Sequence, residues 1–470
     1  MSESEIDLPG APPAAQAGRL DEDDRLKPGY VRDVMEAVEA GDSELARALV
    51  DPLHPADLAD LFELIDSDDR RALAAAIADM LDGDVLAEMN EHVREELVDT
   101  LDPRQVADIA GEMETDDAVA MIEDLEEDEQ RAVLRELDPD DRAAIEEALA
   151  YPEESAGRLM QRDLIAVPEH WTVGQVIDYL RAGDDLTTDF WEVFVVDERH
   201  HPVGTCMLSW ILRTHRNVAV ADVMKREQTL IPVDMDQEEV ALRFQKYALI
   251  SAAVIDQSGR LVGMITVDDI VHIIQEEASE DVLLLSGAGE GDINQPLLES
   301  YSSRVRWLIA NLGTALVAAT IISLFEGTIA KMVALAALMP IVAGVGGNAG
   351  TQTLAVTVRA LATNQLTQSN SWRAIMREMR VAVLNGVTVA AVIGVGVGLV
   401  FANAGLGGVI AAAMLANIVI AGFAGVFVPL ALERAGADPA VASSVFVTMV
   451  TDSMGFLVFL GLATASGIAG

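Results

Sequence analysis

The chain of 470 residues contains one cysteine, Cys206, and only four lysines, and aromatic side chains make up 4% of it. A single cysteine excludes an intramolecular disulfide and gives no sign of an oxidising compartment. The amino terminus, MSESEIDLPG, is acidic and polar, so it does not resemble a signal peptide. We therefore expect the amino-terminal part to stay in the cytosol.

Basic residues are scarce mainly in the first two thirds of the chain. Residues 1–302 carry a net charge of −49, whereas residues 303–470 carry +3. An acidic surface of this size repels nucleic acid and anionic lipid and attracts cations, so we expect no nucleic-acid partner. Adaptation to a salty cytoplasm explains the same composition and is compatible with a cation-sensing role. The split itself indicates one aqueous part and one membrane part.

Signatures of catalysis are also missing. The sequence contains no recognisable nucleophile–base pair, no phosphate-binding loop and no His/Cys cluster with metal-ligand spacing. It therefore does not predict an enzyme.

Residues 1–28 are rich in Pro, Ala, Gly and Asp, which predicts a disordered lead-in. Residues 29–150 have a helical pattern with an internal repeat offset by 48 residues. LHPADLADLFELIDSDDR, from Leu53, matches LDPRQVADIAGEMETDDA, from Leu101, and LDPDDR at Leu137 resembles the opening of a third copy. Repeats of this length predict stacked helix pairs, so we expect an acidic, all-α superhelical domain.

Residues 151–270 contain a second repeat, offset by 59 residues. FVVDERHHPVGTCM, from Phe194, matches AVIDQSGRLVGMIT, from Ala253. Each copy predicts short strands alternating with helices. The tandem resembles a pair of CBS domains, which implies an α/β fold in which the two units pack as a pseudo-twofold dimer.

The second CBS unit contains a candidate nucleotide site. Thr266 and Asp269 in GMITVDD resemble the ribose-contacting pattern of nucleotide-binding CBS domains. The first unit has Met207 and Trp210 at the matching positions, so the resemblance implies at most one ATP site per chain.

The remaining sequence predicts a connector and five membrane spans. Residues 271–302 begin with VHIIQEEASEDVLLL, typical of an amphipathic connecting helix, followed by a flexible joint, GAGEGDINQP. Within 303–470, uncharged runs long enough to cross a bilayer lie at Trp307–Phe325, Met332–Val358, Val381–Leu432 (two spans, divided at Asn403–Gly408) and Ala440–Ala463. The arginine-rich loops predict a cytoplasmic amino terminus and an outside carboxyl terminus. We expect a multi-pass protein of the plasma or inner membrane.

Asp452 is the only charged residue of the fifth span. A charge at the centre of a membrane helix costs about 2.5–3.5 kcal/mol on insertion scales and usually marks an ion or proton path. The alternative is a protonated Asp that is hydrogen-bonded to a neighbouring helix. Thr448 and Thr451 lie within one turn and can contribute to a polar face.

The second span contains the unusual sequence MPIVAGVGGNAGTQT. Pro340 removes a backbone donor, and glycines such as Gly344 and Gly347 permit close helix approach or a local break. Asn348 and Gln352, four residues apart, share one helix face. Ordinary helix packing explains the glycines alone, but together with the amides and an intramembrane Asp they favour a pore wall with carbonyl oxygens exposed to water.

A lone carboxylate per chain suits a hydrated divalent cation. Mg²⁺ requires octahedral oxygen ligands and releases its waters reluctantly, so a pore can hold the hydrated ion through its outer shell. A homodimer would supply two carboxylates around a twofold axis.

The order of these parts, together with PIVAGVGGNAGTQT and TDSMGFLVFLGLA, resembles the MgtE family of magnesium channels; YPEESAGRLM, from Tyr151, resembles it too. The resemblance implies a homodimeric Mg²⁺ channel for magnesium uptake. It places Asp452 as the selectivity carboxylate and the second span at the pore wall. The candidate pore residues are Asp452, Asn348, Gly344, Gly347, Gln352 and Thr451.

The resemblance also implies that intracellular Mg²⁺ bound between the cytosolic domains closes the pore, with the connector as a plug. The matching acids are Asp116, Asp117, Asp269, Glu277, Glu280 and Asp281. Ala120, Ala248 and His272 depart from the acidic pattern, which leaves the number of regulatory ions open. An alternative function is a membrane-anchored, CBS-type adenine-nucleotide sensor that regulates a partner. That alternative leaves Asp452 unexplained.

Overall fold

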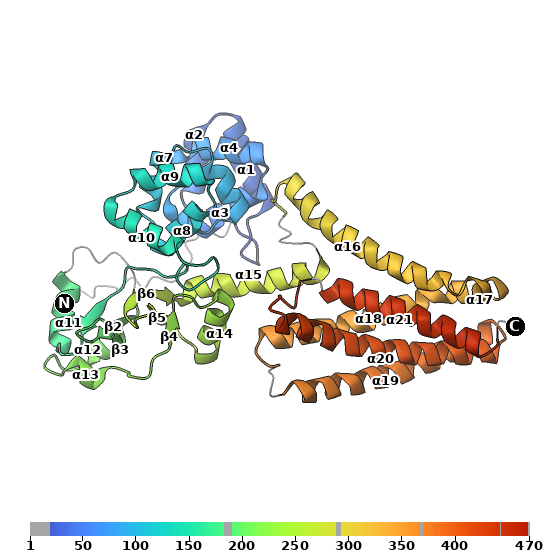
Figure 1. Ribbon diagram of the computed structural model, residues 1–470. Coiled ribbons are helices and arrows are strands. Elements are labelled where there is room, and N and C mark those ends of the chain that lie inside the picture. Colours follow the sequence, from blue (N-terminus) through green and yellow to red (C-terminus); the bar gives the residue numbers. More distant parts are fainter. Residues whose placement is uncertain (1–18, 183–189, 288–292, 367–369, 442, 469–470) are drawn as a thin grey trace, which may run out of the picture. The chain divides into compact units, whose positions relative to one another are not determined.

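The computed structural model describes residues 19–182, 190–287, 293–366, 370–441 and 443–468. They form two compact units that divide between Ile274 and Gln275, within helix α15 (Val267–Ser286). The first unit contains short helices followed by two small sheets, and the second contains five long apolar helices (Figure 1). The multidomain fold class expected from the sequence is confirmed.

The amino-terminal part is built from short helices. They are α1 (Pro28–Glu39), α2 (Ser43–Val50), α3 (Pro55–Leu64), α4 (Ser67–Ala76), the 3₁₀ helix η2 (Ala78–Met80), α5 (Gly83–Ala87), α6 (Glu91–Val98), α7 (Pro103–Ala110), α8 (Thr115–Glu123), α9 (Glu127–Glu136) and α10 (Pro139–Leu149). Every helix from α2 to α10, except η2 and α5, begins at Ser43 or a whole multiple of twelve residues after it. The 48-residue repeat therefore contains four twelve-residue units. The LDPDDR motif opens α10, three units after α7 begins.

Acidic residues that cap helices account for part of the large number of Asp and Glu residues. The side chain of Asp42 accepts a hydrogen bond from the backbone N–H of Leu45, and Asp66 accepts one from Asp69. Asp102 forms a reciprocal capping box with Gln105. Such caps satisfy backbone donors that have no partner within the helix. This share of the negative charge is structural and needs no cation.

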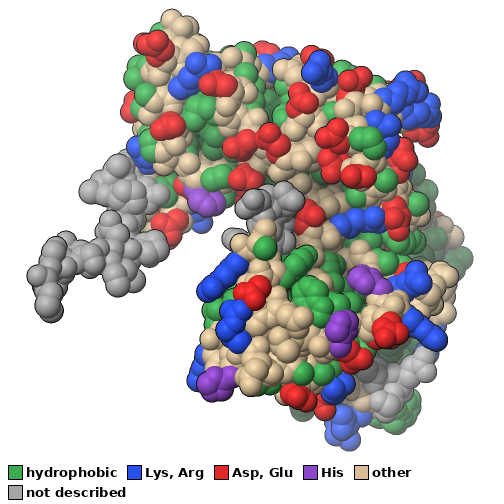
Figure 2. Space-filling view, turned by 90° about the vertical axis from the view of Figure 1, so that its left-hand side faces the viewer, with side chains coloured by type: hydrophobic (Ala, Val, Ile, Leu, Met, Phe, Trp, Pro, Cys, Tyr) green, Lys and Arg blue, Asp and Glu red, His purple; other side chains and the backbone are tan. Residues whose placement is uncertain are grey.

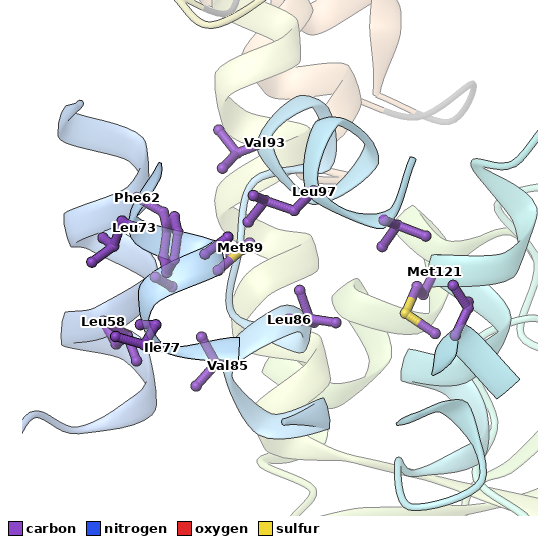
Figure 3. Packing of buried hydrophobic residues seen from close by; sticks show 14 of the residues in the cluster. Leu58, Phe62, Leu73, Ile77, Val85, Leu86, Met89, Val93, Leu97 and Met121 are labelled. Atoms are coloured by element: carbon purple, nitrogen blue, oxygen red, sulfur yellow. The ribbon is translucent and has the colours of Figure 1, made fainter. Parts of the chain in front are cut away.

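A continuous apolar core holds these helices together. Figure 3 shows part of it, from α3 to α8: Leu58, Phe62, Leu73, Ile77, Val85, Leu86, Met89, Val93, Leu97 and Met121. Leu26 is buried in the same core and pairs with Leu20 in an antiparallel bridge. The chain therefore folds onto the domain before α1, within the stretch expected to be a disordered lead-in. Residues 1–18 of that stretch lie outside the described residues.

Two three-stranded sheets follow. Their strands are β1 (Ala166–Pro168), β2 (Glu192–Val196), β3 (Pro202–Met207), β4 (Leu230–Pro232), β5 (Ser251–Ile255) and β6 (Leu261–Thr266), and their helices are α11 (Val173–Ala182), α12 (Leu208–Arg213), α13 (Val220–Val223) and α14 (Gln237–Tyr247). In each sheet the middle strand is parallel to the first and antiparallel to the third. β5 and β6 begin 59 residues after β2 and β3, which confirms the second repeat.

The two sheets also contact one another through equivalent positions. The hydroxyl of Ser251 donates to Oε1 of Glu192 over 2.6 Å, and these residues are 59 apart. Phe194 and Ala253, again 59 apart, share one buried cluster. The duplicated units therefore pack around a local pseudo-twofold axis.

The second unit contains the membrane helices. They are α16 (Leu297–Ser323), the short α17 (Glu326–Lys331), α18 (Ala334–Ala362), α19 (Ser371–Val400), α20 (Ala404–Arg434) and α21 (Ser443–Ala465). All except α17 are long and apolar enough to cross a membrane. α20 lies at the centre and packs against α18, α19 and α21, whereas α16 packs mainly on α21 (Figure 1).

Several boundaries differ from the predicted ones. α16 and α19 begin ahead of the uncharged runs and include arginines such as Arg306 and Arg373, because long arginine side chains can reach the aqueous interface while the helix continues. α15 starts four residues before Val271, directly after β6. Residues 288–292 of the predicted joint lie outside the described residues.

Of the two possibilities that the glycines of the second span left open, close helix approach and a local break, the structure shows no break. α18 is one continuous helix through Pro340 and the glycines, so the carbonyl oxygens of the glycines accept hydrogen bonds within the helix. Neighbouring helices support it: a side chain at Gly350 would overlap Val447, and one at Gly425 would overlap the Gly350 carbonyl. Gly350 and Gly425 therefore serve close packing.

Candidate ion pathway and acidic cation site

Contacts between helices place two predicted pore residues at one level of the bundle. Gly350 of α18 lies against Val447 and Thr451 of α21, whereas Gly346 and Gly455 both lie against the side chain of Asn417. The two helices therefore run antiparallel. Asn348 is midway between the α18 glycines, and Asp452 lies between the corresponding points on α21. Because a helix rises 1.5 Å per residue, Asn348 and Asp452 lie at about the same depth.

The predicted α18 residues form an exposed polar face. Gly344, Asn348 and Gln352, spaced by four residues, are all exposed, and Gly347 is half-buried. A side chain at Gly344 or Gly347 would meet nothing within 4 Å. Asp452 is half-buried, and within the described chain its carboxylate has no hydrogen bond or ion pair. An exposed polar stripe in an apolar helix requires water or a second protein surface opposite it.

Thr451 does not belong to this face. It is fully buried, its hydroxyl donates to the carbonyl of Thr448 in its own helix, and its methyl group lies against Gly350. Neighbouring helix positions are rotated by about 100°, so a residue next to Asp452 faces elsewhere. The structure therefore places Thr451 in the packing between α21 and α18, away from the predicted pore surface.

A second group of acids gathers in the first unit. Asp116 and Asp117 lie in the first turn of α8, with Glu114 as its N-cap residue, and Asp268 and Asp269 lie in the first turn of α15. Helix amino termini favour negative charge. The fold thus brings Asp116 and Asp117 near Asp269, although more than 150 positions separate them in sequence.

Mutual repulsion in this group adds to the cost of burial. Burial, followed by the charge of Asp269, raises the pKa of Asp117 to about 6, and it raises that of Asp116 well above its usual range. Burial and the charges of Asp269 and Asp117 raise the pKa of Glu114 to about 7. Burial also raises the pKa of Asp269. The group therefore holds protons near neutral pH when no cation is bound.

The buried Asp116 side chain shows how a cation would fit. Its Oδ1 has no hydrogen-bond partner in the part of the chain that the structure describes, and the charge of Asp269 acts on the same carboxyl. A hard cation would offset the negative charge and satisfy the oxygen. The ligands are not preassembled, because no set of three or more His, Cys, Asp or Glu residues among those described is arranged to hold a metal ion.

Surface acids differ from this group. Figure 2 shows Asp and Glu side chains spread across the visible face with basic side chains between them. Several are paired, such as Glu127 and Asp128 with Arg131. The overall negative charge alone therefore does not locate a binding site.

Comparison with known proteins identifies the family. Family models match the chain at residues 339–462 (divalent cation transporter), 53–154 (MgtE intracellular N domain) and 220–276 (CBS domain). The magnesium transporter MgtE of Enterococcus faecalis is 32% identical over 320 residues, covering 68% of this chain and 71% of that protein. That of Thermus thermophilus is 30% identical over 439 residues, covering 92% and 97%. The chain belongs to the MgtE family.

A solved structure is also similar: the cytosolic domain of the Mg²⁺ channel MgtE in complex with ATP. It is 28% identical and aligns with a TM-score of 0.48 over 52% of this chain and 99% of that one.

The connector of this MgtE chain contacts the membrane helices. Leu284 and Leu285, at the end of α15, pack against an apolar cluster that includes Leu354 and Val447. Burial, together with the charge of Asp438 in the α20–α21 loop, raises the pKa of Asp281. Of the predicted connector acids, Glu277 and Glu280 lie on the same helix, in the second unit.

The predicted nucleotide residues are in contact with each other. The hydroxyl of Thr266 donates to Oδ2 of Asp269 over 2.7 Å, and Thr266 is buried. Asp269 is thus shared by the candidate nucleotide site and the acidic group of this MgtE chain.

Three further residues were missed by the sequence reasoning. Glu114 stands at a helix-cap position, but Gln161 donates to its carboxylate and it does not cap α8. Asp438 is a single acid in the α20–α21 loop, and no sequence pattern marks it as part of a site. Asn417 is the only amide within α20, and a single amide in an apolar span is a signal that could have been used.

Proposed function

We propose that two copies of this chain form a Mg²⁺-selective pore for magnesium uptake, lined by Asp452 and the exposed polar face of α18. The observation that carries the proposal is the shared depth of Asn348 and Asp452, neither of which is fully buried, in a chain of a magnesium-transporter family. A twofold axis beside α18 and α21 gives the exposed stripe the second protein surface that it requires.

The chemistry suits a hydrated divalent cation. Two Asp452 carboxylates supply the negative charge, while Asn348 and Gln352 accept and donate hydrogen bonds to the waters around Mg²⁺. Mg²⁺ keeps most of its waters, so selectivity rests on the size and charge of the hydrated ion. Gly344 and Gly347 leave room for it because they present no side chain.

The distribution of charge supports the orientation. Arg304 and Arg306 lie in the first part of α16, Arg373 and Arg377 lie at the start of α19, and Arg434 ends α20. By the positive-inside rule, these ends are cytoplasmic. The amino terminus is then inside and the carboxyl terminus outside the plasma or inner membrane.

Intracellular Mg²⁺ closes this pore by binding to the cytosolic acids. Asp116, Asp117 and Asp269, with Glu114, hold a cation that offsets their mutual repulsion. Glu277, Glu280 and Asp281, with Asp438, form a second group on the connector and the α20–α21 loop. A bound cation shifts the equilibrium only by its differential affinity for the two states. The acids must therefore lie farther apart in the open state.

The parts divide this work in chain order. Residues 29–150 and 151–270 form the sensor, residues 271–302 transmit its state, and residues 303–470 conduct. ATP binding at Thr266 and Asp269 would compete with the cation for Asp269. Titration of ATP binding with and without Mg²⁺, in the native chain and in Asp269→Asn, tests this part separately.

The decisive experiment measures Mg²⁺ flux into liposomes that contain the purified chain. Asp452→Asn and Asp452→Ala should lose nearly all flux while inserting and dimerising normally. Glu326→Gln, which neutralises an exposed acid of the same unit, should conduct like the native protein. Native flux in both Asp452 variants would discard the proposed pathway.

A further inference from the structure

A single buried amide joins three membrane helices. Asn417 of α20 is fully buried, and its Nδ2 donates to the carbonyl of Val342 on α18 over 2.9 Å. That carbonyl can only accept, so the amide orientation is determined. A β-carbon built at Gly346 would lie 2.1 Å from Nδ2, and one at Gly455 of α21 would lie 2.7 Å from it. The amide is thus held between two glycines on different helices.

Packing alone does not explain an amide here. Its Oδ1 has no hydrogen-bond partner among the described residues, and an unpaired acceptor in an apolar bundle is unfavourable. An apolar side chain would avoid that cost. What the amide supplies is a directional bond to one carbonyl of α18, which an apolar residue cannot make.

The position of this contact relates it to the ion pathway. Gly346 lies two residues before Asn348, and Gly455 lies three residues after Asp452. A turn of helix contains 3.6 residues, so both pathway residues are within one turn of the contact. A slip of either helix past α20 would separate Asn348 from the depth of Asp452.

We propose that Asn417 is a positioning residue that locks α18 to α21 and holds Asn348 and Asp452 at one depth. The proposal rests on the proposed pathway, although Asn417 itself does not line it. The amide sets the relative height and rotation of the two helices through its bond to Val342 and its fit between the glycines.

The interlock predicts second-site compensation. Gly346→Ala places a methyl group where the amide lies, so it should lower the melting temperature of the purified protein. In the double variant Gly346→Ala/Asn417→Ala, the methyl group occupies the space that the amide vacates. Its melting temperature should therefore recover toward the native value. Gly461→Ala, on α21 with nothing within 4 Å of the added carbon, is the matched control and should melt like the native protein.

Positioning is tested by ion preference. In liposomes, Asn417→Ser and the double variant should lower the ratio of Mg²⁺ to Ca²⁺ flux severalfold, because Asn348 and Asp452 are no longer held at one depth. Asn417→Ser is the milder change, because its short hydroxyl bonds within its own helix and does not reach Val342. A merely structural residue would change stability and total flux but leave this ratio unchanged.

Two results would overturn the proposal. One is a double variant whose melting temperature drops by as much as the drops in Gly346→Ala and Asn417→Ala added together. That result would show that the amide and the added methyl group do not share the space. The other is a native flux ratio in both Asn417→Ser and the double variant. The melting temperatures do not depend on conduction. Native flux in the Asp452 variants would therefore reject the proposed pathway without deciding whether Asn417 locks the helices together.

Discussion

The residues of the pathway differ from their surroundings by a few polar atoms in helices of otherwise apolar side chains. Asn348 and Gln352 lie on the exposed face of α18, and Asp452 lies at the depth of Asn348. Neutral amides cannot attract Mg²⁺ as a carboxylate does, but they can replace part of its second hydration shell. Their contribution should therefore be smaller than that of Asp452.

Asn348→Leu and Gln352→Leu should each reduce Mg²⁺ flux by about tenfold, which corresponds to about 1.4 kcal/mol in the barrier. Leucine has a similar volume and makes no hydrogen bond to a hydrated ion. Val356→Leu, at an exposed apolar position of α18, provides the control. Liposome flux measures all three, and equal flux in the Asn348 variant and the control would contradict a role for this face.

Thr451→Val should conduct like the native protein. Its hydroxyl bonds to its own helix and its methyl group packs on Gly350, so a side chain of the same shape without the hydroxyl keeps the contact. The melting temperature should be unchanged or slightly higher, because a buried polar atom is removed. If Thr451→Val clearly lost Mg²⁺ flux while its melting temperature stayed native, Thr451 would belong to the pathway.

At the scale of elements, two helix amino termini create the acidic group. Each terminus alone favours negative charge, but α8 and α15 meet with their acids facing each other. The carboxylates then repel, and their pKa values rise above the usual range. Acids that stabilise each helix amino terminus separately repel one another where the two termini meet. A bound cation or proton removes that repulsion.

This arrangement predicts the pH dependence of stability without Mg²⁺. A carboxyl whose pKa is higher in the folded than in the unfolded state stabilises the fold at low pH. The contribution is complete below the unfolded pKa values near 4 and is lost as pH rises through about 6 for Asp117 and about 7 for Glu114. The urea concentration at which the first unit of the Mg²⁺-free protein is half unfolded should therefore decrease as the pH is raised from 5 to 8.

General repulsion among the many acids produces a similar trend, so variants must separate the two causes. Glu114→Gln/Asp117→Asn should flatten the dependence between pH 5 and pH 8. Glu36→Gln/Glu39→Gln, which neutralises two exposed acids of α1, should leave it nearly unchanged. Equal flattening by both pairs would attribute the dependence to net charge. Because Mg²⁺ must displace the protons, the stabilisation it provides should be larger at pH 8 than at pH 5.

For the whole molecule, net charge and specific bridging make different predictions. The chain carries −46, and a dimer doubles that charge. Salt screens exposed charges over about 8 Å at physiological ionic strength, so bulk repulsion responds to any electrolyte. Buried groups such as Asp116 respond only to an ion that enters the site.

Millimolar Mg²⁺ should therefore protect residues 19–287 from limited proteolysis, whereas NaCl at matched ionic strength should not. Glu277→Gln/Glu280→Gln/Asp281→Asn should weaken this protection and leave the pore conducting at high Mg²⁺. Asp33→Asn/Glu36→Gln/Glu39→Gln removes the same number of charges from exposed positions of α1 and should behave like the native protein. Full protection by NaCl would show that screening, not bridging, compacts the protein.

Local pattern was enough to predict most elements. The 48-residue helical repeat, the 59-residue offset of the sheets and the five apolar runs can all be read along the sequence. Repeats and hydrophobic periodicity report these directly. The same local view left open whether the α18 glycines serve close packing or a break, because it cannot see the side chains that pack against Gly346 and Gly350.

By itself the sequence determined the chemistry: a membrane Asp, amides four apart and acids at helix starts. Only the tertiary structure decided which of them meet. Rotation by about 100° per residue turns Thr451 inward while Asp452 stays partly exposed, and packing between helices sets Asn348 at the same depth. Glu114 and Asn417 acquire their contacts from α15, Gln161 and two distant glycines. Such contacts depend on how separate helices fit together, which no local pattern encodes.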